Sequence, residues 1–485
     1  MPDFDLLVVG GGPGGYVAAI RAAQRGLRVG LVEKERPGGV CLNWGCIPTK
    51  AMLRSAEVFQ TVKDAVDFGV HAENVRFDFA AVRQRKDGIV KELTDGGAGL
   101  LKANGVTVVE GHARFTGPTT VEVYEAGASP IFAGGPRYAA APTAVRTRTL
   151  SATDVIIATG SVPALLPVPG ADLPGVVTSD GAFGLTEVPG RLVVIGGSAV
   201  GAEWASLFAT FGSAVTVVEM QDRLVPLEDK DIGVALGRSF GKRGITVLTG
   251  STVTGIDQAE DGLRVRVGGP GARELDADVV LVGVGRRPNT ADLGLDATGI
   301  VTDARGFIAV DDHLRTDVEH VYAIGDVTGK ALLAHVASHQ GLTAADVIAG
   351  HAAHIDYTVI PAATFTHPEI ASVGLTEDAA RAAGHEVRTA KFPFAALGRA
   401  KSFGETEGFL KIVAGQQHQE VLGVHIIGPS ASDLITEGAL AISLEATLDE
   451  LAGTIHAHPT LGEIGMEAAL TGLGLPVHIA PPRKR

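Results

Sequence analysis

The stretch DLLVVGGGPGGYVAAIRAAQRGLRVGLVE at residues 5–33 predicts the fold, and RLVVIGGSAVGAEWASLFATFGSAVTVVE at residues 191–219 repeats its pattern. Each stretch reads as an apolar strand, a glycine-rich turn, an Ala-rich helix, a second apolar strand and a terminal glutamate. That glutamate, Glu33 in the first stretch and Glu219 in the second, follows the first glycine of its turn by 23 residues. One glycine fingerprint is weak evidence, because a turn packed tightly on a helix also needs glycines. Two copies in the same frame indicate two dinucleotide sites.

Length and composition limit the remaining possibilities. A chain of 485 residues is too long for one core and predicts two to four domains. A net charge of −14 argues against a nucleic-acid partner, because phosphate binding relies on a basic surface. The chain enters its first predicted strand without a basic, apolar leader, and it contains no run of eighteen apolar residues. We therefore expect a cytoplasmic protein that does not enter membranes.

Residues 38–50, GGVCLNWGCIPTK, contain Cys41 and Cys46, which are the two cysteines of the chain. Cα atoms five residues apart in a helix lie roughly 8–9 Å from each other, whereas a disulfide needs about 4.4–6.8 Å. The segment must therefore depart from a regular helix if the two cysteines bond. Pro48 suits the first turn of a helix, and a thiol at a helix N-terminus has a lowered pKa. A metal site is not expected, because two cysteines without clustered histidines cannot complete a tetrahedral set. Inert thiols are the alternative, which the position directly after a glycine fingerprint disfavours.

The rest of the chain follows a mixed pattern. Residues 51–100 are expected to be helical and residues 101–158 rich in strands. The Gly-, Ala- and Pro-rich stretch at 125–142 indicates a surface excursion. After about residue 352, strands at 409–413 and 421–428 and a long helix over 432–448 predict one further α/β domain.

Ordered motifs along almost the whole chain carry a family resemblance. They are VVGGGPGGYVAA, GGVCLNWGCIPTK, IIATGS, VGVGRRPNT, YAIGDVTG, LAHVA, THPEIASVGLTE, GRAKSFGETEGFLKI and IHAHPTLGE. With these motifs the sequence resembles the pyridine nucleotide–disulfide oxidoreductase family, and within it the branch that oxidises dihydrolipoamide.

The resemblance implies an α/β fold with two Rossmann-like dinucleotide-binding domains, for FAD and NAD, and a C-terminal α+β dimerisation domain. It implies an FAD domain at 1–152, an NAD domain at 153–281, a segment at 282–352 that completes the FAD domain, and the interface domain at 353–485. The protein would be an obligate homodimer with shared active sites.

The same resemblance assigns the cofactor contacts. Lys50 and Glu203 would form an ion pair beside the flavin. The FAD site would include Gly10, Gly12, Gly15, Glu33, Lys50, Ala113, Thr159, Gly160, Glu203, Asp326 and Ala334. The NAD site would include Gly196, Gly197, Gly201, Glu219, Val253 and Gly285.

Glu219 favours NAD over NADP, because a carboxylate accepts hydrogen bonds from a ribose 2′-hydroxyl and repels a 2′-phosphate. One nearby arginine, Arg223, does not outweigh that repulsion. Ser198 departs from the family pattern, since it stands where the second turn is expected to have its middle glycine. Its hydroxymethyl group would either crowd the NAD pyrophosphate or donate a hydrogen bond to it. We expect crowding and a weakened NAD affinity.

The resemblance also names the catalytic groups. Cys41 would be the thiol that exchanges with substrate, and Cys46 the thiol beside the flavin. His458 would be the acid–base group and Glu463 its orienter, because imidazole titrates near neutrality and a carboxylate fixes its tautomer. The two lie five residues apart, so the turn at Pro459 must bring them together.

The implied reaction is the NAD-dependent oxidation of dihydrolipoyl groups. They would arrive on the lipoyl domains of a 2-oxo acid dehydrogenase complex or a glycine-cleavage system. One alternative is an NAD(H)-dependent reductase of another small disulfide. A second, from a different class, is a flavoprotein subunit with relaxed catalysis.

Overall fold

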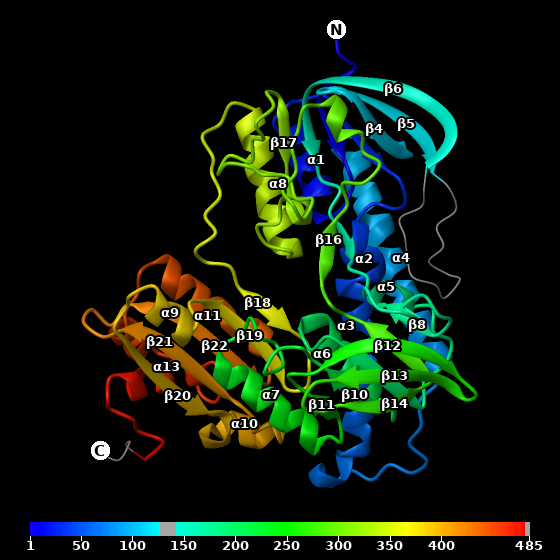
Figure 1. Ribbon diagram of the computed structural model, residues 1–485. Helices are drawn as coiled ribbons and strands as arrows, with labels where there is room; N and C mark the ends of the chain where they lie inside the picture. The colour runs from blue at the N-terminus through cyan, green and yellow to red at the C-terminus, as the bar shows by residue number, and fades with distance from the viewer. Residues whose placement is uncertain (127–141, 481–485) are drawn as a thin grey trace. The chain divides into compact units, whose positions relative to one another are not determined.

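The computed structural model describes residues 1–126 and 142–480 (Figure 1). Its chain divides into two compact units. Unit 1 comprises Met1–Leu166, Pro174–Glu187 and Gly285–Asp356, and unit 2 comprises Pro167–Leu173, Val188–Val284 and Tyr357 onward. The excursion expected at 125–142 falls almost wholly outside the described residues.

The main sheet of unit 1 has seven strands, and its parallel part consists of apolar runs buried on both faces. Leu6 and Val8 face a core shared with the Ala-rich helix α1 (Pro13–Gln24) and with α8 (Ala334–Ile348). The strand order is β3 (Thr107–Glu110), β2 (Val29–Glu33), β1 (Phe4–Val9), β6 (Pro142–Ile157), β5 (Thr120–Ala126) and β4 (His112–Gly117), with β17 (Val321–Ala323) paired to β6.

The long strand β6 joins two kinds of pairing in this sheet. Its first part pairs antiparallel with β5, and Figure 1 shows it curving along β5 and β4. Its last residues, 152–157, run parallel to β1. This part of β6 and β1 therefore end at the same edge of the sheet, where the glycine turn follows β1.

Helices lie between β2 and β3 in the chain, as the sequence predicts for residues 51–100. Asp78 caps the longest of them by accepting a hydrogen bond from the Ala81 amide at 3.1 Å. The remaining elements of unit 1 are α2 (Gly39–Trp44), α3 (Cys46–Lys63), η1 (Ala65–Phe68), α4 (Phe79–Ala103), β7 (Ser161–Pro163), β8 (Val176–Thr178), α5 (Ser179–Ala182), β16 (Arg286–Pro288), η3 (Leu295–Ala297) and η4 (Gly325–Thr328).

The first part of unit 2 repeats the strand–turn–helix arrangement. Its parallel strands lie in the order β11 (Thr246–Leu248), β10 (Ala214–Val218), β9 (Arg191–Ile195) and β15 (Val279–Val282). Trp204 and Phe208 of α6 (Ala199–Thr210) are buried and stack with ring centroids 5.5 Å apart. The other elements are α7 (Lys230–Lys242) and an antiparallel sheet of β12 (Thr252–Ala259), β13 (Gly262–Gly268) and β14 (Arg273–Ala277).

The C-terminal part of unit 2 is an antiparallel five-stranded sheet whose helices share its core. The strands predicted at 409–413 and 421–428 are confirmed as β21 and β22. The sheet order is β18 (Ala362–Thr364), β19 (Glu369–Gly374), β22 (Val421–Gly428), β21 (Phe409–Gly415) and β20 (Val387–Pro393), with helices α9 (Glu377–Ala382), η5 (Phe394–Ala396), α10 (Gly398–Phe403), α11 (Ala431–Ser443), α12 (Leu448–Gly453) and α13 (Glu463–Gly472).

The single helix predicted over 432–448 is wrong in its extent. Helix α11 ends at Ser443, and Glu445 adopts a left-handed backbone with φ of 54°. Thr447 then caps a new helix, α12, in a capping box with Glu450. The fold class itself is confirmed: two Rossmann-like parallel sheets and a C-terminal α+β region.

Candidate functional site

The first glycine turn joins β1 to α1. Gly10 has φ of +103°, which side-chain-bearing residues rarely adopt. A methyl group on Gly15 would overlap the carbonyl oxygen of Gly10, so the helix packs directly on the turn. At Gly12, the N-cap of α1, an added Cβ would meet no described atom within 4 Å. The turn therefore leaves open space at a helix N-terminus, where a pyrophosphate fits.

Two polar groups beside this turn fit an adenine dinucleotide. The Glu33 carboxylate accepts hydrogen bonds from the amides of Gly11 at 2.6 Å and Glu35 at 2.8 Å. A carboxylate at this distance from the first glycine of the turn can accept hydrogen bonds from a ribose hydroxyl. The Thr159 hydroxyl is buried and has no hydrogen-bond partner among the described residues. The predicted residue Gly160 follows it in the loop and accepts from the Asn289 amide at 2.9 Å.

Asp326 lies in η4, where Ser161 and Arg286 hold its surroundings. The Ser161 hydroxyl donates to Asp326, and Arg286 Nε donates to that hydroxyl at 2.6 Å. Burial raises the pKa of Asp326, with Ser161 and Arg286 acting in the opposite direction. Ser161 and Arg286 were not among the predicted site residues, although both stand inside quoted motifs. Of the other predicted FAD residues in unit 1, Ala113 is buried in β4, Ala334 begins α8 and Lys50 lies in α3.

The two cysteines lie at adjoining helix ends. Cys41 belongs to α2, and Cys46 begins α3 after a break at Gly45 with φ of −138° and ψ of −107°. The expected departure from regular helix between the two cysteines is confirmed, and Pro48 lies in the first turn of a helix, as expected. The Cys41 thiol hydrogen-bonds to Cys46, and this contact together with burial raises the pKa of Cys41. Both side chains are present as thiols.

The cysteine loop packs on the first glycine turn. The Gly38 amide donates to the Gly11 carbonyl at 2.7 Å. A methyl group on Gly39 would lie 2.7 Å from Gly12 Cα, so the start of α2 touches the backbone of the turn. The loop that contains Cys41 and Cys46 is thus anchored to the turn that fits a dinucleotide.

The second glycine turn joins β9 to α6 in the same way. Gly196 has φ of +101°, and a methyl group on Gly201 would overlap the Gly196 carbonyl oxygen. The Glu219 carboxylate accepts from the amides of Gly197 at 2.6 Å and Gln221 at 2.7 Å. The left-handed glycine, the closely packed helix and the glutamate match those of the first turn, and this geometry fits a second adenine dinucleotide.

Three further predicted residues are placed separately. Glu203 of α6 is 6% exposed and accepts from the Phe365 amide at 2.9 Å within unit 2. Val253 is buried in β12. Gly285 belongs to unit 1 and has φ of +117°. The predicted pair between Lys50 of unit 1 and Glu203 of unit 2 stays a prediction, since each unit is described by itself.

His458 and Glu463 are brought together, as predicted. His458 Nδ1 and Glu463 Oε1 are 2.8 Å apart, and the other Glu463 oxygen accepts from the Thr460 amide at 2.8 Å. Partial burial acts to raise the pKa of Glu463, but these hydrogen bonds outweigh it and the pKa is lowered. The imidazole side chain is 78% exposed, so its other nitrogen can meet a substrate.

A second histidine–carboxylate pair lies beside the first. His456 Nε2 is 2.7 Å from Glu437 Oε1, and His456 Nδ1 is 2.9 Å from the Thr454 carbonyl oxygen. Glu437 was missed in the sequence, because it lies 19 residues before His456 on α11.

Two family models match the chain. Residues 4–341 match pyridine nucleotide-disulphide oxidoreductase, and residues 360–469 match the dimerisation domain of the same group. The first match contains the two glycine turns and the two cysteines, and the second contains His458 and Glu463.

Curated relatives match over almost the full length. A dihydrolipoyl dehydrogenase of Chlamydia muridarum is 43% identical over 483 residues, which cover 99% of each chain. One of Geobacillus stearothermophilus is 45% identical over 479 residues, or 98% of each chain.

Solved structures agree with these matches. LpdA from Mycobacterium tuberculosis has a TM-score of 0.86 at 28% identity, over 96% of this chain and 98% of that one. The HOCl-induced flavoprotein disulfide reductase RclA from Escherichia coli has a TM-score of 0.83 at 28% identity, over 96% and 99%. Within residues 1–126 and 142–480, the structure contains no helix long and apolar enough to span a bilayer.

Proposed function

This chain belongs to the pyridine nucleotide–disulphide oxidoreductase family, and we propose that it oxidises dihydrolipoyl groups carried on lipoyl domains, as a dihydrolipoyl dehydrogenase. It is an NAD-dependent oxidoreductase with FAD as its cofactor, and its dimerisation domain makes it a homodimer. The observation that carries the proposal is the anchoring of the Cys41–Cys46 loop on the first glycine turn through Gly38 and Gly39.

Thiol–disulfide exchange is the first half of the proposed reaction. His458 takes a proton from one substrate thiol, and the resulting thiolate attacks Cys41 of the oxidised pair. The Cys41–Cys46 bond breaks, and Cys46 leaves as a thiolate at the N-terminus of α3, where the helix dipole favours negative charge. The second substrate thiol then attacks the mixed disulfide, which releases lipoamide and the Cys41 thiol.

His458 supplies the proton transfer. Glu463 fixes the imidazole tautomer with Nδ1 toward the carboxylate and stabilises the imidazolium after proton uptake. Bound FAD would relay the two electrons from the dithiol to NAD⁺. Gly10, Gly12, Glu33, Thr159 and Asp326 would hold it.

NAD⁺ would lie on the second turn. We propose that Glu219 binds the adenosine ribose and that Gly196, Gly197, Gly201, Val253 and Gly285 contact the rest of the nucleotide. We further propose an FAD domain at 1–152 and 282–352, an NAD domain at 153–281 and an interface domain at 353–485.

The proposed partners are lipoyl domains of a 2-oxo acid dehydrogenase complex or of a glycine-cleavage system. We propose the cytoplasm as the compartment, where structural disulfides are rare and a cysteine pair is available for catalysis.

The test is dihydrolipoamide-dependent NAD⁺ reduction by the wild type and by His458→Gln. Since general acid–base catalysis contributes about 10²–10⁴-fold, kcat should fall by at least roughly 100-fold. His478→Gln is the matched control, because His478 is also an exposed histidine paired with a glutamate, Glu467, at 2.6 Å. It should keep the wild-type rate.

Two outcomes would contradict the proposal. If the wild type does not oxidise dihydrolipoamide but reduces another small disulfide with NADH, it is a different reductase on this scaffold. A wild type that binds FAD and turns over no disulfide would be the relaxed flavoprotein subunit.

A further inference from the structure

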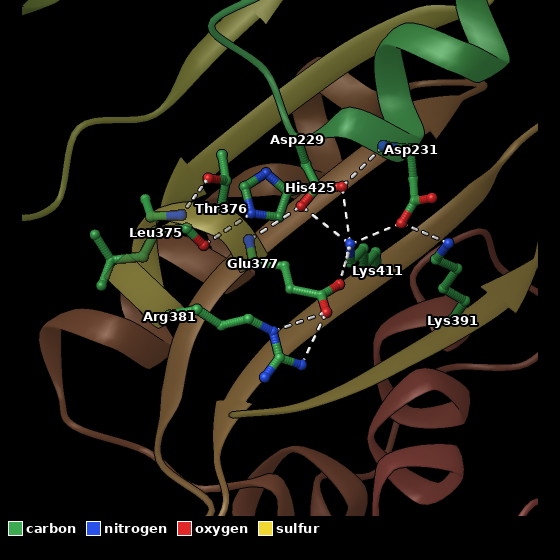
Figure 2. A network of polar contacts seen from close by, with 10 residues as sticks. Asp229, Asp231, Leu375, Thr376, Glu377, Arg381, Lys391, Lys411 and His425 are labelled. Carbon is green, nitrogen blue, oxygen red and sulfur yellow. Dashed lines mark hydrogen bonds and ion pairs between the residues drawn. The ribbon is translucent and has the colours of Figure 1, made fainter. Parts of the chain in front are cut away.

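A buried lysine gathers three carboxylates in unit 2 (Figure 2). Lys411 lies in the middle of β21, and its side chain is 2% exposed. Its Nζ is 2.9 and 3.0 Å from the two oxygens of Asp229, 2.7 Å from Asp231 Oδ2 and 2.9 Å from Glu377 Oε2. The four residues come from three segments far apart in the sequence.

The negative charges of the three carboxylates in this cluster are matched by the positive charges of Lys411 and two outer cations. Burial alone would lower the pKa of Lys411, but the hydrogen bonds to the carboxylates outweigh it and the pKa is raised. Two outer cations complete the set, because Lys391 lies 2.6 Å from Asp231 and Arg381 lies 3.0 Å from Glu377. Removing one buried partner of such a set leaves a charge without compensation, which is costly.

Asp229 joins this cluster to two backbone amides. It is 1% exposed, and besides Lys411 it accepts from the amides of Asp231 at 3.0 Å and Glu377 at 3.1 Å. It is also the N-cap of α7. The cluster therefore fixes the point where α7 begins.

The link 220–229 runs from Glu219 to this fixed point and covers the second glycine turn. The Val225 amide donates to the Gly197 carbonyl at 2.9 Å. Gly197 has room for no side chain, since an added Cβ would lie 2.6 Å from Leu224 Cδ2. On its other side, the Leu224 carbonyl oxygen lies 2.6 Å from a Cβ built on Gly233 of α7. The link is thus packed between the turn and the helix that Asp229 caps.

We propose that Lys411 is a positioning residue for NAD⁺: by fixing Asp229, it holds the link 220–229 against the second glycine turn and keeps the wall of the nucleotide site formed. Lys411 touches no nucleotide and acts through Asp229 and the link. This inference rests on the proposed function only in taking the second turn as the NAD site.

The test uses Asp229→Asn in the FAD-loaded dimer. Asparagine still caps a helix, so the variant weakens the contact to Lys411 and spares the start of α7. The NAD⁺ dissociation constant, measured by calorimetry without thiol substrate, should rise roughly tenfold, which corresponds to a link docked in about one molecule in ten. Hydrogen exchange of the link should accelerate, with exchange in the first glycine turn unchanged.

Lys391→Met is the matched control. It removes a lysine from the same cluster, but one whose side chain is 44% exposed and whose ion pair is with Asp231. NAD⁺ affinity should stay at the wild-type value.

A double-mutant cycle keeps the proposal falsifiable if Asp229→Asn is destabilised. Leu224→Ala removes the side-chain contact of the link with Gly197 and leaves the cluster intact. If Lys411 acts through the link, the NAD⁺ dissociation constant of the double variant should be close to that of the single variant that binds NAD⁺ less tightly. If the two substitutions act independently, their fold-changes in the dissociation constant should multiply. Multiplied effects, or an Asp229→Asn dimer with wild-type NAD⁺ affinity and link exchange, would overturn the inference. Because these measurements use no thiol substrate, they test the inference even if the protein does not oxidise dihydrolipoyl groups.

Discussion

The two glycine turns have nearly the same backbone but different coverings. Gly10 and Gly196 have φ of +103° and +101°, and each turn is closed by a glutamate that accepts an amide hydrogen bond at 2.6 Å. The first turn is covered by the cysteine loop, with Gly39 against Gly12. The second is covered by the link 220–229.

This difference separates two tasks that one motif performs. A turn that the redox loop covers through Gly38 and Gly39 suits a cofactor that stays in place while the cysteines react. A turn covered by the link 220–229 suits a nucleotide that must enter and leave in each cycle. If both turns bind dinucleotides as proposed, the motif would hold the pyrophosphate and the covering segment would set whether the dinucleotide stays or exchanges.

The largest effect is expected from adding a methyl group to the glycine of each turn that packs on the turn's first carbonyl. Gly15→Ala and Gly201→Ala each place a methyl group on a carbonyl oxygen one turn away. Overpacking of this kind costs about 1–3 kcal/mol, so cofactor affinity at the altered turn should fall roughly 10- to 100-fold. FAD content by absorbance should fall in Gly15→Ala alone, and NAD⁺ binding by calorimetry should fall in Gly201→Ala with FAD retained. Loss of FAD from both variants would show that the turns are not independent.

A smaller effect is expected from the paired glutamates. In Glu219→Gln, the side chain keeps one oxygen for the Gly197 amide but loses the charge that repels a 2′-phosphate. Hydrogen bonds to charged groups contribute about 1.5–3 kcal/mol, so the NAD⁺ dissociation constant should rise roughly tenfold while NADP⁺ binding improves relative to it. Glu33→Gln is the control and should weaken FAD binding with this preference unchanged. Unaltered discrimination in Glu219→Gln would refute the assignment of the second turn.

Local sequence was enough to predict both turns and a helix N-terminus near Cys46, whereas the pairing of His458 with Glu463 was predicted from the family resemblance. In each case the residues lie within one short segment, so spacing and turn chemistry determine their geometry. Lys411 was not predicted, because its partner Asp229 lies 182 residues earlier and tertiary packing alone joins them.

Two other features were missed for related reasons. Arg286 and Ser161 meet across 125 residues of sequence, and their motifs gave no sign of the contact. The end of α11 was missed because Glu445 adopts a left-handed backbone conformation, which the helix propensity of the segment does not predict.

The smallest effect is expected at Ser198, one of the positions where the two turns differ in sequence. Ser198 and Gly12 are both N-caps with extended backbones, at φ of −76° and −66°. Ser198 is exposed, and its side chain makes no capping hydrogen bond to the described helix, so Ser198→Gly should change stability by only a few tenths of a kcal/mol. If the hydroxymethyl group crowds the pyrophosphate, the variant should lower the KM for NAD⁺ by roughly threefold, equivalent to about 0.6 kcal/mol. A raised KM would instead mean that the hydroxyl donates to a phosphate oxygen, and Gly12→Ser should then leave FAD affinity undiminished.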